Sequence, residues 1–325
     1  MVKHTESIEN ILKAMQTFNA YENMPPQKQL SIAKDVQYEI ETYDVFLHEY
    51  LMLRFDLLPP EERRKYLLTS EHAWRLPEGV NIDMYYGKYD LLNKAKQFVS
   101  RDYMCIEDSS KQDLRDFLKR HEKIIVKPLH LQCGEDVKVY CSSECDYERL
   151  YDELVKNDTP LVEEYIYQHP EMAKFHPGSL NTIRITTLTD FDGNIAYKAA
   201  DIRTGIGNSY VDNTSRGGIS APVDIESGIV IGDAIDSTCH SYEKHPDTGT
   251  VFKGFEIPRF DEVLKKADEY VRVFDKMHIH GWDIAIRENG DIELIEANTI
   301  PDLSIVQFFY GPLNELYKKL YRRER

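Results

Sequence analysis

The amino-acid sequence predicts an α+β fold in which a helical N-terminal region precedes two lobes built on antiparallel sheets. Apolar residues recur at helical spacing near the N-terminus, short β-branched runs alternate with helical segments in the middle, and hairpin signals fill the last half. We therefore expect a helical region over residues 1–85, a first lobe over residues 86–160 and a second lobe over residues 161–325.

The composition restricts the class of protein. The 325 residues are 42% hydrophobic and 30% charged, which is typical of a soluble globular chain and not of a disordered one. The formal net charge of −16 argues against nucleic-acid binding, which needs a dominant positive field. We find no signal-peptide core and no run of roughly 18 apolar residues that could span a membrane. Together with an odd count of five cysteines, which favours reduced thiols, this predicts a cytoplasmic protein.

The first 85 residues carry the pattern of several short helices. Ile8, Ile11 and Met15 recur at helical spacing, and proline pairs at residues 25–26 and 59–60 divide the region. No catalytic pattern occurs here, so we expect helices that pack against the lobes or bind a partner.

The first lobe is predicted to alternate helices and strands. Helices are expected at residues 94–100, 113–121 and 147–156, and strands at residues 123–127, 137–140 and 161–166. A glycine-containing segment at residues 131–137 joins the first two strands.

Two hairpins dominate the second lobe. The first has its turn at Asp192-Gly193, and the second has its turn at Asn289-Gly290. A two-residue turn in the second hairpin places Asp283 directly opposite Glu296, with Asn298 on the same face.

Two carboxylates directly opposite each other on a sheet repel, so Asp283 and Glu296 need compensation. A hard divalent cation held by the two carboxylates and the amide oxygen of Asn298 would supply it. The alternative is a pair of solvated acids on an exposed face of the sheet.

The first hairpin carries a second charged pair. The turn at Asp192-Gly193 places Asp201 opposite Arg184, and Arg203 shares their face. A cross-strand ion pair would explain this pattern, and so would an arginine that Asp201 orients toward phosphate oxygens. The sequence contains no P-loop, no HExxH motif and no nucleophile elbow.

These motifs resemble the ATP-grasp superfamily in type and in order along the chain. Asp283, Glu296 and Asn298 are similar to its metal-binding set, and residues 131–137 resemble its glycine loop over the phosphates. Lys94 and Lys127 resemble its two nucleotide lysines, with Lys88 and Lys96 as close competitors for the role of Lys94, and residues 162–166 resemble its adenine hinge.

Within that superfamily the chain resembles the sugar-transfer-associated ATP-grasp group. Residues 168–170, 176–185 and 217–224 carry this resemblance, together with the helical N-terminal region. It implies work in surface polysaccharide or glycoconjugate biosynthesis.

The resemblance implies a role for each site residue. It implies nucleotide contacts for Lys94, Lys127, Glu163, Glu164, Tyr165, Ile166, Gln168, His169 and Glu171, and catalytic cations in Arg184, Arg203 and Arg216. His176 and the loop over residues 213–220 are expected to govern the choice of acceptor. The chain departs from the pattern at Gly281, where a basic residue often stands in the superfamily.

The implied activity is an ATP-dependent ligase that uses ATP and Mg²⁺. A small-molecule carboxylate would be converted to an acylphosphate, which an amine or a sugar-linked acceptor then attacks, with ADP and phosphate as products. Two alternatives stay open: a kinase that phosphorylates a sugar or alcohol, and a nucleotide-binding scaffold without catalysis.

Overall fold

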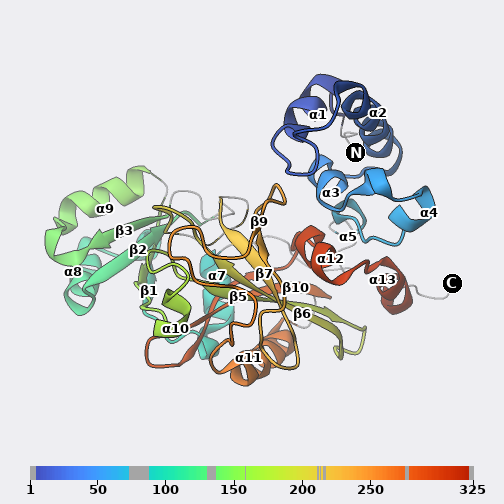
Figure 1. Cartoon of the computed structure of the whole chain (residues 1–325). Helices are drawn as coiled ribbons and strands as arrows, with labels where there is room; N and C mark the ends of the chain where they lie inside the picture. The colour runs from blue at the N-terminus through green and yellow to red at the C-terminus, as the bar shows by residue number, and fades with distance from the viewer. Residues whose placement is uncertain are drawn as a thin grey trace.

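The computed structural model describes residues 5–72, 88–129, 137–157, 159–210, 212, 214, 217–274 and 278–321. It confirms the predicted α+β architecture, with a helical N-terminal region and two antiparallel sheets (Figure 1). The helices within these ranges are all too short or too polar to cross a bilayer.

The N-terminal region forms a helical cluster with its own core. Its elements are α1 (Ile8–Met15), α2 (Pro26–Tyr43), α3 (Leu47–Met52), the 3₁₀ turn Phe55–Leu57, α4 (Pro60–Arg63) and α5 (Thr69–His72). The Ser7 side chain caps α1, and the second proline of each pair begins α2 and α4. Tyr21, Tyr50 and Phe55 are fully buried between these helices.

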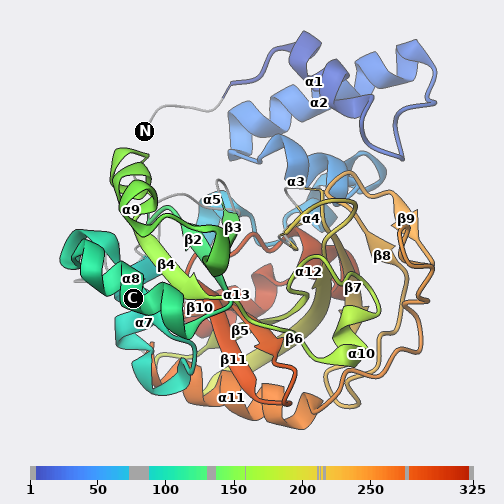
Figure 2. The same ribbon diagram turned by 90° about the vertical axis from the view of Figure 1, so that its left-hand side faces the viewer.

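The first sheet has the strand order β1-β4-β2-β3. Its strands are β1 (Tyr103–Cys105), β2 (Lys123–Lys127), β3 (Lys138–Cys141) and β4 (Leu161–Glu164), and the helices α8 (Lys111–Arg120) and α9 (Tyr147–Lys156) pack against it. Although residues 161–164 are predicted to open the second lobe, β4 lies between β1 and β2 in the first sheet. Figure 2 shows β4 beside β2. The chain therefore enters the second lobe after Glu164.

The second sheet has seven strands in the order β11-β10-β5-β6-β7-β8-β9. They are β5 (Thr182–Thr189), β6 (Ile195–Thr204), β7 (Ile219–Val223), β8 (Ala234–Ile235), β9 (Ser241–Tyr242), β10 (Ile279–Ile286) and β11 (Ile292–Asn298). Helix α11 (Phe260–Val273) covers one face, where Tyr270 and Phe274 pack on Trp282. Two further helices, α7 (Lys88–Lys94) and α10 (Pro170–Ala173), also contribute apolar side chains to this core.

Both predicted hairpin registers are present. Arg184 pairs with Asp201 as predicted, but the first connection has three residues, 191–193, and a register shift between Leu188 and Thr189 offsets the extra residue. Asp283 pairs with Glu296, but the predicted two-residue turn is wrong. The connection has three residues, 288–290, with Gly290 at φ 90°, and a bulge at Ile295 then shifts the register back.

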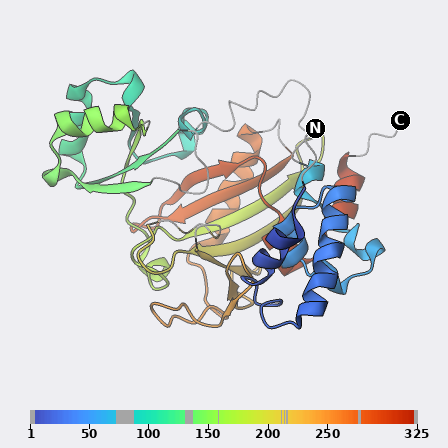
Figure 3. The same ribbon diagram turned by 90° about the horizontal axis from the view of Figure 1, so that it is seen from above.

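The C-terminal helices α12 (Ser304–Tyr310) and α13 (Asn314–Tyr321) join the N-terminal cluster to the second lobe. The Gln307 side chain bonds both the amide and the carbonyl of Leu67, and Tyr310 donates to the carbonyl of Ala200 on β6. The N-terminal cluster and the first sheet thus lie at opposite ends of the second lobe (Figure 3).

Candidate functional site

A cleft opens where the two sheets meet. Lys127 and Glu163 of the first sheet line it, together with Arg203, Asp283 and Glu296 of the second. Its apolar walls come from both lobes: Leu91, Leu92, Ile125, Val137, Leu180 and Ile295. Apolar walls with a few converging charges are typical of a small-molecule site.

Asp283 lies on β10 and is held by Arg184 of the neighbouring strand β5. Arg184 Nε and Nη2 donate to the two carboxylate oxygens at 2.5 and 2.6 Å, which is a bidentate pair between buried side chains. Burial works against the charged guanidinium, but Asp283 outweighs it and raises the pKa of Arg184. A Cβ at Gly281 would lie 2.8 Å from Arg184 Nη1, so Arg184 fills the space beside this glycine.

Arg203 and Asp201 form a second pair on β6. Arg203 Nε and Ser220 Oγ donate to the same oxygen of Asp201, at 3.1 and 2.5 Å, and Arg203 Nη1 lies 3.9 Å from Asp283 Oδ1. The prediction that Asp201 orients Arg184 is wrong. Arg184 lies between the carboxylates of two neighbouring strands, and its guanidinium donates to Asp283. Asp201 instead accepts from Arg203.

The structure brings together the predicted metal-binding set. Asn298 Nδ2 donates to Asp283 Oδ2 at 3.2 Å, and Glu296 is the direct cross-strand neighbour of Asp283. Burial, and then the charge of Asp283, raise the pKa of Glu296, although Lys88 and Lys127 lower it. Arg184 therefore compensates the charge of Asp283, whereas burial and that same carboxylate disfavour the ionised form of Glu296.

Asp212 adds a third carboxylate to the cleft. Its side chain accepts from the amide of Thr182 at 2.9 Å and from the Thr182 hydroxyl. Burial, reinforced by Asp283, raises the pKa of Asp212 to about 7. This part of the cleft thus concentrates negative charge that is not fully balanced.

Lys127 ends β2 and faces Glu163 of the adjacent strand β4. Its Nζ lies 2.8 Å from Glu163 Oε2, and Arg101 Nε donates to the same oxygen at 2.9 Å. Burial alone would raise the pKa of Glu163, but Arg101 and Lys127 outweigh it and lower the pKa to about 2. Glu163 is therefore ionised and fixes the position of Lys127 in the cleft.

The structure places Lys88 in the cleft lining, whereas Lys94 lies elsewhere. Lys94 Nζ is 4.8 Å from the ring centroid of Phe274, within the α11 side of the second lobe. Six positions apart on one helix, the two lysine side chains point about 120° apart, so only one can face the cleft. Lys88 is thus better placed than Lys94 to bind a ligand there.

The predicted hinge residues at the end of β4 and directly after it have mixed surroundings. Glu164 points away from Glu163, as successive residues of a strand do, and bonds Arg287 at 2.6 Å. The amide of Tyr165 donates to the carbonyl of Lys123, and the Ile166 side chain is buried.

The side chains after the hinge bind the protein itself. Gln168 bonds the carbonyls of His176 and Ser179, His169 caps α10, and Glu171 pairs with Lys174. His176 is buried and lies 2.9 Å from the Gly207 carbonyl. These side chains hold their own loop in place, and the ligand contacts predicted for them stay predictions.

Two predicted features lie outside the described residues: Arg216, and residues 131–136 of the glycine-containing segment. Residues 213 and 215 of the predicted acceptor loop lie outside them too. Conversely, the sequence gives no signal for Arg101 or Asp212. Arg101 precedes a three-residue strand, and Asp212 stands in a glycine-containing loop without periodicity.

This fold and this site define an ATP-grasp protein. A family model for sugar-transfer associated ATP-grasp proteins matches residues 76–319, so the chain belongs to that family. The chain matches no curated protein sequence.

Solved structures with similar folds include several ligases. The ATP-grasp ligase PsnB with its minimal precursor is 14% identical, with a TM-score of 0.43 over 72% of this chain and 60% of that one. D-alanyl-alanine synthetase A from Vibrio cholerae is 13% identical, with a TM-score of 0.43 over 74% and 62%. D-cycloserine synthetase DcsG is 14% identical, with a TM-score of 0.40 over 72% and 71%. The chain therefore spans about 60% of the length of the first two.

Proposed function

We propose that the protein is an ATP-dependent ligase that joins a carboxylate to an amine or a related nucleophile through an acylphosphate. One observation carries this proposal. Lys127 of the first sheet and the Asp283–Glu296 pair of the second face the same cleft, so cationic and anionic groups for one Mg·ATP converge between the lobes. Family membership supports the nucleotide, and the structures of PsnB with Mg and ADP support the metal.

The donor set fits a magnesium ion. Asp283, Glu296 and Asn298 offer oxygen ligands, and a bound cation would oppose the burial and the Asp283 charge that raise the pKa of Glu296. Across the described ranges, no cluster of three or more His, Cys, Asp or Glu could hold a metal alone. Phosphate oxygens and water therefore have to complete the ligands, as Mg²⁺ commonly requires, and the bound ion would neutralise charge on the phosphates.

The cations divide into two groups. Lys127 and Lys88 line the cleft beside the apolar walls and would hold the phosphates. Arg203 lines the cleft beside Asp283, and Arg184 lies behind that carboxylate, so these two stand where charge develops on the transferring phosphoryl group.

The reaction then needs no nucleophile from the protein. An oxygen of the substrate carboxylate attacks the γ-phosphorus, the bond to the β-phosphate oxygen breaks, and ADP leaves. The acceptor's lone pair attacks the acyl carbon of the acylphosphate, and inorganic phosphate leaves. The acceptor gives up one proton when it is an amine.

The acceptor would enter beside Asp212, Tyr210 and Leu180, which line the second-lobe side of the cleft. The family name, sugar-transfer associated ATP-grasp, supports a sugar-linked acceptor. A role in surface polysaccharide or glycoconjugate biosynthesis is part of the same proposal. An ammonium group is a good partner for a carboxylate such as Asp212.

Hydroxylamine trapping tests the reaction class. The protein is incubated with Mg·ATP, hydroxylamine and a panel of sugar acids and amino acids, and hydroxamates and nucleotides are measured. We expect a hydroxamate with stoichiometric ADP and phosphate, and its loss in Glu296→Gln. A stable phosphorylated sugar without hydroxamate would establish the kinase instead, and AMP with pyrophosphate would exclude both.

A further inference from the structure

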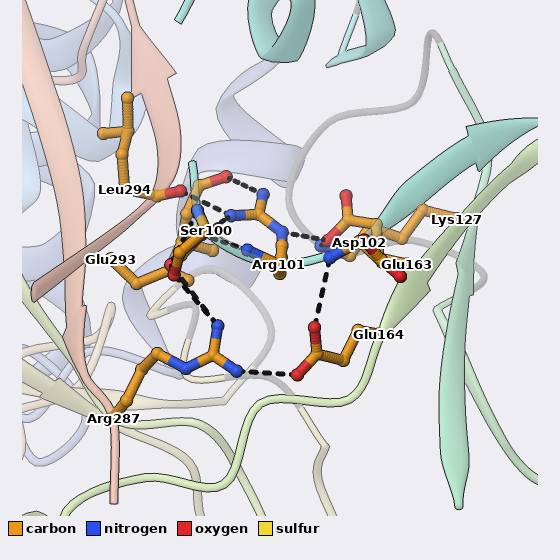
Figure 4. A network of polar contacts seen from close by, with 10 residues as sticks. Ser100, Arg101, Asp102, Lys127, Glu163, Glu164, Arg287, Glu293 and Leu294 are labelled. Atoms are coloured by element: carbon orange, nitrogen blue, oxygen red, sulfur yellow. Dashed lines mark hydrogen bonds and ion pairs between the residues drawn. The ribbon is translucent and has the colours of Figure 1, made fainter. Parts of the chain in front are cut away.

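Arg101 connects the two sheets from a fully buried position just before β1 (Figure 4). Its Nε donates to Glu163 Oε2 of β4 at 2.9 Å, and its Nη1 donates to Glu293 Oε1 of β11 at 2.8 Å. The same guanidinium donates to the carbonyls of Leu294 at 2.7 Å and Ile295 at 3.3 Å. One side chain therefore makes four contacts that span both lobes.

The first-lobe end of this network reaches the cleft. Glu163 Oε2 accepts from both Arg101 and Lys127, so the two cations share one carboxylate oxygen. If Arg101 were absent, Glu163 would lose its anchor to the second lobe and Lys127 would face the whole charge of that carboxylate. The position of the Lys127 ammonium in the cleft thus depends on Arg101.

The second-lobe end reaches the carboxylate pair. Ile295 is the extra residue of the bulge that places Glu296 opposite Asp283. A bulge disrupts the ladder locally, and here Arg101 supplies the bond to the Ile295 carbonyl. The register of Glu296 thus depends on Arg101 as well.

We propose that Arg101 is a positioning residue that couples the lysine of the nucleotide site to the carboxylate pair of the metal site across the two lobes. It touches neither ligand and acts through Glu163 on Lys127 and through the β11 bulge on Glu296. This inference rests on the proposed Mg·ATP site.

The chain offers a matched control in Arg287. This arginine also bridges the sheets, because it bonds Glu164 at 2.6 Å, Ser100 Oγ at 3.1 Å and lies 3.5 Å from Glu293. It lies on the other side of β4 and bonds Glu164, not Glu163 (Figure 4). Loss of Arg287 therefore removes a bridge between the lobes and leaves the Glu163–Lys127 contact in place.

The test is a double-mutant cycle of Mg·ATP affinity, measured by calorimetry on the full chain. Arg101→Met should weaken binding roughly tenfold to a hundredfold, as expected for the loss of a charge-assisted contact, and Arg287→Met less than about threefold. Because Arg101 acts partly through Lys127, its effect should shrink at least about threefold in a Lys127→Ala background. The Mg²⁺ concentration for half-maximal ATP binding should rise in Arg101→Met and not in Arg287→Met.

Two results would overturn the inference. The first is a double variant whose loss of Mg·ATP affinity equals the product of the losses in Arg101→Met and Lys127→Ala. The second is an equal loss of Mg·ATP affinity in Arg101→Met and Arg287→Met. If Arg101→Met does not fold, Arg101→Lys serves, since it keeps the charge but cannot make all four contacts. Wild-type affinity in Arg101→Lys would overturn the inference too. Failure of the wild-type protein to bind Mg·ATP would instead overturn the proposed function, and the inference with it.

Discussion

A methyl group added at Gly281 would enter the space that the Arg184 side chain fills. The added Cβ would lie 2.8 Å from Nη1, 3.0 Å from Cδ and 3.2 Å from Cζ of Arg184, and these are its three nearest neighbours. Ordinary contact begins near 3.4 Å, so the guanidinium has to recede from Gly281. Its two bonds to Asp283 cannot both keep their lengths of 2.5 and 2.6 Å when it moves.

The change in the free energy of unfolding follows from the two hydrogen bonds between Arg184 and Asp283. Loss of one charge-assisted hydrogen bond costs about 1.5–3 kcal/mol. Alanine in a strand regains about 0.5–1 kcal/mol of chain entropy relative to glycine. Gly281→Ala should therefore lower the free energy of unfolding by roughly 1–2 kcal/mol. In an Arg184→Ala background the steric conflict is gone, and the same substitution should stabilise the protein by about 0.5–1 kcal/mol.

Urea denaturation measures this change of sign. In a Trp74→Phe background, fluorescence of Trp282 is a local probe, because this fully buried residue follows Gly281 in β10. The four proteins compared are the wild type, Gly281→Ala, Arg184→Ala and the double variant. At unchanged m-value their free energies of unfolding give the coupling between positions 184 and 281. The same loss of stability in both backgrounds would refute the claim that Arg184 occupies the space beside Gly281.

Two further predictions concern the cleft. Lys127→Ala should weaken ATP binding roughly tenfold to a hundredfold in calorimetry. The exposed control Lys138→Ala should have no effect. An unchanged ATP affinity in Lys127→Ala would show that Lys127 does not contact the nucleotide. Because burial and Asp283 raise the pKa of Asp212 from 3.8 to about 7, the metal-free folded state keeps a proton that the unfolded chain releases, so the contribution of Asp212 to stability should fall as pH rises from about 4 to about 7. Asp212→Asn should remove this slope in urea titrations at several pH values, whereas Asp192→Asn at an exposed turn should keep it, and equal slopes in the two variants would contradict the assignment.

Local turn chemistry makes the hairpins predictable from sequence, but both registers are correct for an unforeseen reason, because each turn is one residue longer than predicted and a register shift offsets it. The second hairpin shows the cause. The turn is one residue longer than Asn-Gly suggests, and the bulge at Ile295 offsets the difference. The bulge is bonded by Arg101, which lies 194 positions away in the chain. No local pattern reports a contact of that range.

The residues that line the cleft are less predictable than the strands. Lys88 and Lys94 stand on one short helix, and no local pattern shows that Lys94 lies over the ring of Phe274 while Lys88 lines the cleft. Asp212 lies in a loop, where neither the two-residue period of a strand nor the 3.6-residue period of a helix predicts the direction of a side chain. Gln168 is polar and close to the cleft, yet its bonds go to two carbonyls of its own loop.

The central claim is that ATP binds in the cleft together with a divalent ion held by Asp283 and Glu296. Thermal unfolding with ATP alone, Mg²⁺ alone and both together tests it most directly, in wild type, Glu296→Gln and the exposed control Glu288→Gln. At an ATP concentration of about 100 times Kd, stabilisation by roughly 2.7 kcal/mol is expected only with both ligands, in wild type and in Glu288→Gln. Equal stabilisation by ATP without Mg²⁺, or an unchanged response in Glu296→Gln, would contradict it.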